Sequence, residues 1–162
     1  MIAVLQRVNN ATVYADGELS GSIERGLYIL LGVEKGDLER DAELLSEKIS
    51  KLRIFTDEND KMNLSVMDIG GEIMVVSNFT LSANYSHGNR PDYLSAASPD
   101  DANRLYEYFI KLISQKVKKT ASGKFGADMR TEISTDGPVT IIMNSEILKG
   151  EKNDSAYRRK HK

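Results

Sequence analysis

The chain contains no cysteine and no tryptophan, and its 162 residues include only two histidines, His87 and His161. Without cysteine there can be no disulfide bond, no thiol nucleophile and no thiolate zinc site. Two isolated histidines without paired carboxylates do not form a metal-ligand set. Phosphate-binding and dinucleotide-binding glycine motifs are also missing. We therefore expect a protein that requires no metal and no cofactor.

Long apolar runs are missing as well. The longest, residues 27–33, is far shorter than the roughly 20 residues needed to cross a bilayer, and its length fits a buried strand. Residues 1–8 have neither the basic start nor the small-residue cleavage site of a secretory signal. These absences predict a cytoplasmic protein that has no membrane partner.

The net charge of −2 is unevenly distributed. Residues 146–162 contain six basic and three acidic residues, so the excess of negative charge lies in residues 1–145. An acidic body argues against a surface that coats nucleic acid broadly. We expect one domain over residues 1–145, followed by a basic, disordered tail over residues 146–162. A tail that contacts RNA phosphates is the alternative.

Short apolar runs separated by glycine turns predict β-strands in both halves of this domain, with Asp16-Gly17 as a hairpin turn. The expected strands cover residues 2–8, 11–15, 18–23, 27–33, 73–79, 129–134 and 139–143. A tight turn is expected at residues 135–138, between the last two.

Two helices are expected between these strands. The first begins near Asp37 as its cap, and the second has Ser98 as cap and Pro99 at its first position. Strands on both sides of two helices predict an α+β domain whose antiparallel sheet is curled into a barrel-like shape. The long polar loop over residues 82–97 is typical of a functional segment.

Catalytic side chains are hard to find by pattern. His87 lies in a Tyr-Ser-His-Gly segment with no nucleophile-elbow sequence nearby, although a Ser/Thr esterase that uses His87 stays open. Residues 77–81 place hydroxyl and amide groups at the end of an apolar strand, which is either a site or an ordinary strand end. Asp136-Gly137-Pro138 read alone is a turn with a trans bond, since only about 5–6% of X-Pro bonds are cis.

Taken together, these two segments resemble the signature motifs of the D-aminoacyl-tRNA deacylases, Ser-Gln-x-Thr-Leu and Asn-x-Gly-Pro-x-Thr. The chain has Asn78 where the family has glutamine and Thr135 where it has asparagine. These two differences change contacts that the family makes through side-chain amides, whereas contacts through backbone groups do not depend on them. The resemblance extends to Gln6-Arg7-Val8, Leu31-Gly32-Val33, Leu52-Arg53-Ile54-Phe55, Lys61-Met62-Asn63, Gly88-Asn89-Arg90-Pro91 and Phe125-Gly126-Ala127-Asp128-Met129.

The resemblance implies hydrolysis of the ester that links a D-amino acid, or glycine, to the 3' end of tRNA, a proofreading step in translation. It implies a homodimer in which a cis Gly137-Pro138 pair enters the partner's pocket, binds the substrate ammonium group and excludes L side chains. A nucleic-acid-binding module of the same fold without esterase activity is the alternative.

The resemblance also implies roles for individual residues. The catalytic segment would be Ser77, Asn78, Phe79 and Thr80, with Arg7, Phe125 and Met129 supporting substrate binding. Thr80 has no neighbouring base in the sequence, so we assign it to positioning, with help from the 2'-hydroxyl of the terminal adenosine.

Overall fold

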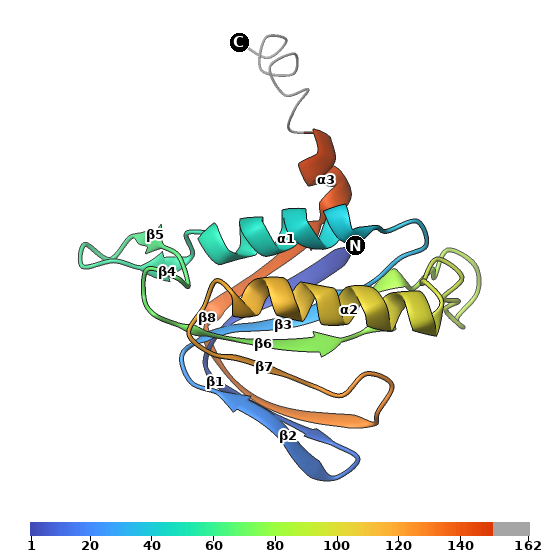
Figure 1. The fold of residues 1–162 in the computed structure, drawn as a ribbon, viewed down its shortest axis with the longest axis horizontal. Coiled ribbons are helices and arrows are strands. Elements are labelled where there is room, and N and C mark those ends of the chain that lie inside the picture. Colours follow the sequence, from blue (N-terminus) through green and yellow to red (C-terminus); the bar gives the residue numbers. More distant parts are fainter. Residues whose placement is uncertain (151–162) are drawn as a thin grey trace.

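A computed structural model of the chain describes residues 1–150 and has an α+β fold, which confirms the predicted class. Its main sheet has six strands: β1 (Ile2–Ala15), β2 (Glu18–Ile23), β3 (Gly26–Gly32), β6 (Glu72–Ser77), β7 (Thr120–Ser122) and β8 (Met129–Asn144). A small ribbon is formed by β4 (Phe55–Thr56) and β5 (Met62–Leu64). Helices α1 (Glu39–Lys51) and α2 (Pro99–Ser114) lie next to each other on one side of the sheet (Figure 1).

The long strand β1 organises the sheet. Its first half pairs antiparallel with β3 and its second half with β2, while β8 follows the whole length of its other side. Residues 2–15 therefore form one strand where the sequence predicted two. The sheet curls until its two ends meet, and the Ser20 hydroxyl on β2 donates to the Ser122 carbonyl on β7 over 2.9 Å. The approach of β2 to β7 makes the sheet barrel-like.

The sheet is mixed in direction. The three pairings of β1 are antiparallel, as predicted, whereas β3 pairs with β6 and β6 with β7 in parallel. A parallel pair requires a long crossover. The chain supplies one through α1 between β3 and β6, and another through α2 between β6 and β7.

The central strands β3 and β6 are buried on both faces. Alternate residues such as Ile29 and Val75 pack in the main core with Leu45 of α1 and Phe109 of α2. The intervening residues, Tyr28, Met74 and Val76, pack inside the curl of the sheet against Val13 and Ile23. Burial on both faces accounts for the unbroken apolar runs in the sequence.

The start of α1 differs from the prediction. The helix begins at Glu39 with Leu38 as its N-cap, and the Asp41 carboxylate accepts a hydrogen bond from the Leu38 N–H at 2.9 Å. Asp37 was predicted to cap this helix, but its carboxylate accepts from the Glu34 N–H at 2.7 Å, within the preceding turn. The prediction for α2 is confirmed, since the Ser98 hydroxyl accepts from the Asp101 N–H at 3.3 Å.

A third short helix, α3 (Ser145–Lys149), occupies the start of the segment predicted to be a disordered tail. The Lys149 ammonium lies 2.7 Å from a carboxylate oxygen of Asp41, and the Ser145 hydroxyl donates to Asp41 over 2.6 Å. The rest of the predicted tail, residues 151–162, lies outside the described residues. No helix within residues 1–150 is long and apolar enough to span a membrane.

The predicted hairpin turn at residues 135–138 is wrong, because both halves of β8 pair with the same strand. Thr135 pairs with Val8 and Thr140 with Gln6, so residues 136–139 stand opposite the single residue Arg7. We call residues 136–139 the Gly-Pro bulge. Its Gly137-Pro138 peptide bond is cis.

Candidate active site

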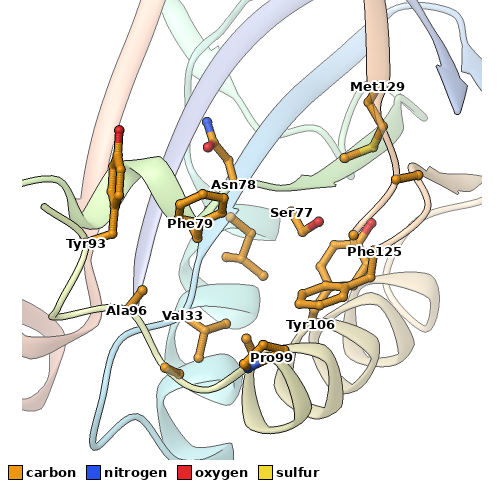
Figure 2. A pocket seen from close by; sticks show the side chains of 15 residues that line it. Val33, Ser77, Asn78, Phe79, Tyr93, Ala96, Pro99, Tyr106, Phe125 and Met129 are labelled. Carbon is orange, nitrogen blue, oxygen red and sulfur yellow. The ribbon is translucent and has the colours of Figure 1, made fainter. Parts of the chain in front are cut away.

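A pocket of about 540 Å³ opens where β6 ends, between the start of α2 and the connection from β7 to β8. Its lining is mostly apolar and aromatic, and Figure 2 shows that the side chains around it come from several separate parts of the chain. They include Ser77, Asn78 and Phe79 after β6, Tyr93 from the 82–97 loop, Tyr106 from α2, and Phe125 and Met129 around the β7–β8 connection.

Strand β6 ends at Ser77, two residues before the predicted end, and the chain turns into the 3₁₀ helix η1 (Phe79–Ser82). The Asn78 N–H donates to the Leu31 carbonyl at 2.8 Å, which fixes the turn to β3. The Asn78 side-chain oxygen caps η1 by accepting from the Thr80 N–H at 3.1 Å and from the Thr80 hydroxyl. The Phe79 N–H begins the helix, so it has no acceptor within the helix and none among the described residues.

Aromatic rings stand on two sides of the pocket. The Phe79 ring is 59% exposed and meets the Tyr93 ring edge to face, with 5.0 Å between ring centroids. On the other side, the rings of Tyr106 and Phe125 lie 6.0 Å apart (Figure 2). Such an arrangement offers flat apolar surfaces to a planar or apolar group.

Tyr106 supports this second side. Its buried hydroxyl is 2.9 Å from the Val75 carbonyl and 3.2 Å from the Gly123 carbonyl, so it links β6 to the β7–β8 connection. Burial raises the pKa of Tyr106 to about 12, so the hydroxyl stays protonated and donates at neutral pH. Gly123 leaves room for Met129, because a Cβ atom on Gly123 would lie 2.4 Å from the Met129 sulfur.

The Gly-Pro bulge is held from inside by Arg7, which is only 9% exposed. Its Nε lies 3.0 Å from the Asp136 carboxylate and 3.2 Å from the Asp136 carbonyl, while its Nη1 donates to the Ile54 carbonyl at 2.7 Å. Gly137 and Pro138 themselves are exposed. No residue of the bulge lines the pocket of the same chain.

The structure therefore sorts the predicted site residues into two groups. Five line the pocket: Ser77, Asn78, Phe79, Phe125 and Met129. Thr80 is exposed next to them, whereas Arg7, Gly137 and Pro138 belong to the bulge. His87 is exposed and does not line the pocket, so nothing in its surroundings favours the esterase alternative.

Sequence reasoning missed three residues of these two groups. Tyr106 lies on the apolar face of α2, where it is indistinguishable by pattern from a core residue. Tyr93 belongs to the long loop that was expected to be functional, so its position carried a signal. Asp136 showed only as part of a turn motif, because its partner Arg7 is far away in the sequence.

Among residues 1–150, the carboxylates of Asp37, Asp41 and Glu146 lie close enough together to hold a cation. None of them lines the pocket. The Lys149 ammonium already lies 2.7 Å from Asp41 and 2.6 Å from Glu146, so a positive charge is present in the cluster. This cluster serves the attachment of α3.

The fold occurs in solved structures. One is described as "c-Myc DNA Unwinding Element Binding Protein"; it has a TM-score of 0.84 and 39% sequence identity, covering 89% of this chain and 98% of that one. Another is described as a probable eukaryotic D-amino acid tRNA deacylase, with a TM-score of 0.75 over 88% of this chain and 98% of that one. Its 14% identity shows a shared fold alone. Both likenesses thus extend over nearly nine tenths of this chain.

Sequence relatives are more specific. A D-aminoacyl-tRNA deacylase of Geotalea daltonii is 54% identical over 145 residues, covering 90% of this chain and 97% of the relative. One of Caldicellulosiruptor bescii is 49% identical over 146 residues, covering 90% and 98%. The model of the D-Tyr-tRNA(Tyr) deacylase family matches residues 4–144. The chain belongs to this family, and the predicted enzyme class, a hydrolase of the deacylase type, is confirmed.

Proposed function

We propose that the protein hydrolyses the ester bond of D-aminoacyl-tRNA and of glycyl-tRNA, which makes it a proofreading enzyme of translation in the cytoplasm. One observation carries this proposal. The chain belongs to the deacylase family, and it has both residues 77–80 at the edge of a pocket and a cis Gly137-Pro138 bond in an exposed bulge. The substrate would be the aminoacylated 3' end of tRNA.

The pocket suits this substrate in size and chemistry. Its volume of about 540 Å³ is in the range of small-molecule sites, and its aromatic sides can contact the terminal adenosine. The Phe79 N–H, which lacks a partner, can donate to the ester carbonyl and stabilise the negative charge that develops on its oxygen. Thr80 next to it contributes to positioning.

The described lining of the pocket contains no acidic, basic or imidazole side chain, so a general base from the lining is not in place. We propose that the 2'-hydroxyl of the terminal adenosine assists instead. The oxygen of a water molecule attacks the carbonyl carbon, and the bond from that carbon to the ribose 3'-oxygen breaks. The proton lost by the water passes through the 2'-hydroxyl to the 3'-oxygen. The products are the free amino acid and tRNA.

Selection of the D enantiomer follows from holding two groups of the α-carbon. The carbonyl oxygens of Gly137 and Pro138 would accept hydrogen bonds from the substrate ammonium group, while the strand end holds the ester. The third substituent then has a fixed direction, so a D side chain points outward and an L side chain collides with protein. This is selection by exclusion, and it admits glycine because glycine has no side chain.

The Gly-Pro bulge would act in the pocket of a second subunit. It is exposed and does not line the pocket of its own chain, which supports a cross-subunit arrangement in a C2 homodimer. Apolar side chains that a dimer would cover are present, including Ile142 at 74% exposure and Phe79 at 59%. Light scattering is expected to give a dimer mass, and a fully active monomer would contradict this arrangement.

Mixed dimers test the arrangement directly. Phe79→Pro removes the N–H donor at a helix position that tolerates proline, and Gly137→Val disrupts the bulge, so each variant alone should be inactive. A mixture refolded in equal amounts should recover about one quarter of the wild-type activity, because half the dimers then contain one intact pocket facing one intact bulge. No recovery at all would show that each bulge serves its own chain.

The function itself is tested by measuring release of D-tyrosine and glycine from tRNA, with and without a chelator. We expect hydrolysis of both substrates in either condition, and abolition by the chelator would contradict the proposed chemistry. A second candidate, nucleic-acid binding without hydrolysis, is suggested by the description of the 39% identical structure. Salt-sensitive binding of nucleic acid with no ester cleavage would favour it. Under the proposed function, His87→Ala should hydrolyse D-tyrosyl-tRNA normally.

A further inference from the structure

The side-chain oxygen of Asn78 accepts two hydrogen bonds from Thr80, one from the N–H at 3.1 Å and one from the hydroxyl. A backbone N–H can only donate, so the Asn78 atom that faces it must be the amide oxygen. An amide oxygen can only accept, and the Thr80 hydroxyl must therefore donate its hydrogen to it. Both donors of Thr80 are occupied within the chain.

This pairing determines what Thr80 can offer to a substrate. Its hydroxyl hydrogen and its N–H both point to Asn78, whereas the lone pairs of the hydroxyl oxygen are available. An amide oxygen is too weak a base to remove the hydroxyl proton, so Asn78 does not prepare Thr80 for nucleophilic attack. Because Thr80 is exposed beside the pocket, its oxygen can accept a hydrogen bond from an incoming hydroxyl group.

The Phe79 N–H has the opposite character. Phe79 lies between Asn78 and Thr80, and its N–H has no hydrogen-bond acceptor among the described residues. The two groups therefore have different hydrogen-bonding roles toward the substrate. The Phe79 N–H donates to the carbonyl oxygen, and the Thr80 hydroxyl oxygen accepts from the attacking water or from the ribose hydroxyl. Asn78 keeps Thr80 an acceptor because it occupies both donors of Thr80.

We propose that Asn78 is a positioning residue that fixes Thr80 as a hydrogen-bond acceptor for the hydroxyl group that attacks or assists in ester hydrolysis. This inference rests on the proposed deacylase function. It assigns a task to asparagine at a position where the family motif has glutamine. Asn78 acts through Thr80 and needs no contact with substrate.

The test is a double-mutant cycle measured by single-turnover hydrolysis of D-tyrosyl-tRNA. Thr80→Val keeps the shape of the side chain but removes the hydroxyl, and Asn78→Ala removes the acceptor. Each should lower the rate at saturating enzyme about three- to tenfold, the loss expected for one hydrogen bond, with little change in the enzyme concentration that gives half saturation. The double variant should be no slower than Thr80→Val alone, because Asn78 has nothing left to orient. Thr80→Ser should recover the wild-type rate.

Two further variants keep the test free of folding effects. Asn59→Ala makes the same change in the exposed β4–β5 turn and should leave the rate unaltered. Asn78→Gly supplies a residue that is an accepted N-cap, so it removes the amide while preserving η1, and its rate replaces that of Asn78→Ala if the latter melts early. Losses that multiply in the double variant, or that change half saturation alone, overturn the role of Asn78. A wild type that leaves D-tyrosyl-tRNA intact instead overturns the deacylase proposal itself.

Discussion

The guanidinium of Arg7 lies 3.0 Å from the carboxylate of Asp136, although 129 residues separate the two in sequence. Arg7 stands opposite the Gly-Pro bulge in the β1–β8 pairing and is almost completely buried. The residue immediately before Gly137 is thus held by a side chain from the centre of the sheet. The position of the bulge depends on the core of the domain.

Replacing Arg7 with methionine is expected to reduce D-tyrosyl-tRNA hydrolysis at least tenfold. The variant keeps an apolar stem but leaves the Asp136 carboxylate and the Ile54 carbonyl without their donor. The free energy of unfolding should fall by about 2–3 kcal/mol, less than for a fully buried pair because Asp136 is partly exposed. Arg40→Met, on the exposed face of α1, is the matched control. Full activity of a folded Arg7→Met protein would refute the link to the bulge.

Gly137 and Thr80 should differ sharply in their tolerance of substitution. Gly137 has φ +140°, and a Cβ atom there would lie 2.5 Å from the Val139 nitrogen. Gly137→Val should therefore displace the carbonyls that we propose bind the substrate ammonium group, and slow hydrolysis about a hundredfold. Thr80→Ala loses about one hydrogen bond, roughly 0.5–1.5 kcal/mol, and should retain substantial activity. Single-turnover rates of both variants measure these losses, and thermal melting checks that both variants are folded. Trapping of an acyl-enzyme on Thr80 would contradict this mechanism.

Gly123 is expected to control the shape of the pocket through Met129. A methyl group on Gly123 would meet the Met129 sulfur, so the flexible Met129 side chain must move. Because Met129 lines the pocket, we expect this movement to reduce the space in it. Gly123→Ala should therefore lower D-tyrosyl-tRNA hydrolysis more than glycyl-tRNA hydrolysis, because the larger substrate needs the space. Gly150→Ala is the control, since a Cβ atom there meets nothing within 4 Å. Equal losses for both substrates would show that Met129 does not set the available room.

Local patterns in the sequence predicted the elements well but not their arrangement. The cap of α2 and the Asp16-Gly17 turn depend on neighbouring residues, and the structure has both where they were expected. The direction of β6 and the continuity of β1 depend on pairing between distant segments, which apolar periodicity does not encode. Asp37 resembled a helix cap in sequence, yet its carboxylate accepts from the Glu34 N–H, and it is the Asp41 carboxylate that accepts from the N-cap Leu38 N–H.

The site divides in the same way. Residues 77–79 lie at the end of a strand, where polar groups are a local signal, and they do line the pocket. The Gly-Pro bulge looked like a hairpin turn because its pairing with a single residue, Arg7, is visible only in the sheet. Family resemblance connected the two segments, which no spacing rule could do.

The attachment of α3 should depend on pH. Burial works against ionisation of Asp41, but the hydrogen bonds from Lys149 and Ser145 outweigh it and lower the pKa of Asp41 below 3.8. A lowered pKa stabilises the folded state above the unfolded value near 4, and that contribution is lost as pH decreases through the folded value. Lys149→Met should therefore reduce the free energy of unfolding at pH 7 by about 1–2 kcal/mol.

Urea denaturation of wild type and Lys149→Met at pH 7 and at pH 3 measures this effect. The difference between the two proteins should be smaller at pH 3 than at pH 7, because pH 3 is below the ordinary pKa of an aspartate and the contribution of a lowered pKa decreases there. Lys35→Met, an exposed residue of the turn before α1, is the control. A difference that is equal at both pH values would mean that the Asp41 charge does not hold α3.

The central claim is that the protein distinguishes the two enantiomers of an aminoacyl group on tRNA. The most direct measurement is single-turnover hydrolysis of D-tyrosyl-tRNA and L-tyrosyl-tRNA prepared on the same tRNA, at the same enzyme concentration and without added metal. The structure and the family predict rapid loss of the D-tyrosyl ester, while the L-tyrosyl ester decays only at its spontaneous rate. Comparable enzymatic hydrolysis of both esters would contradict selection by exclusion, and stability of both would contradict the deacylase function.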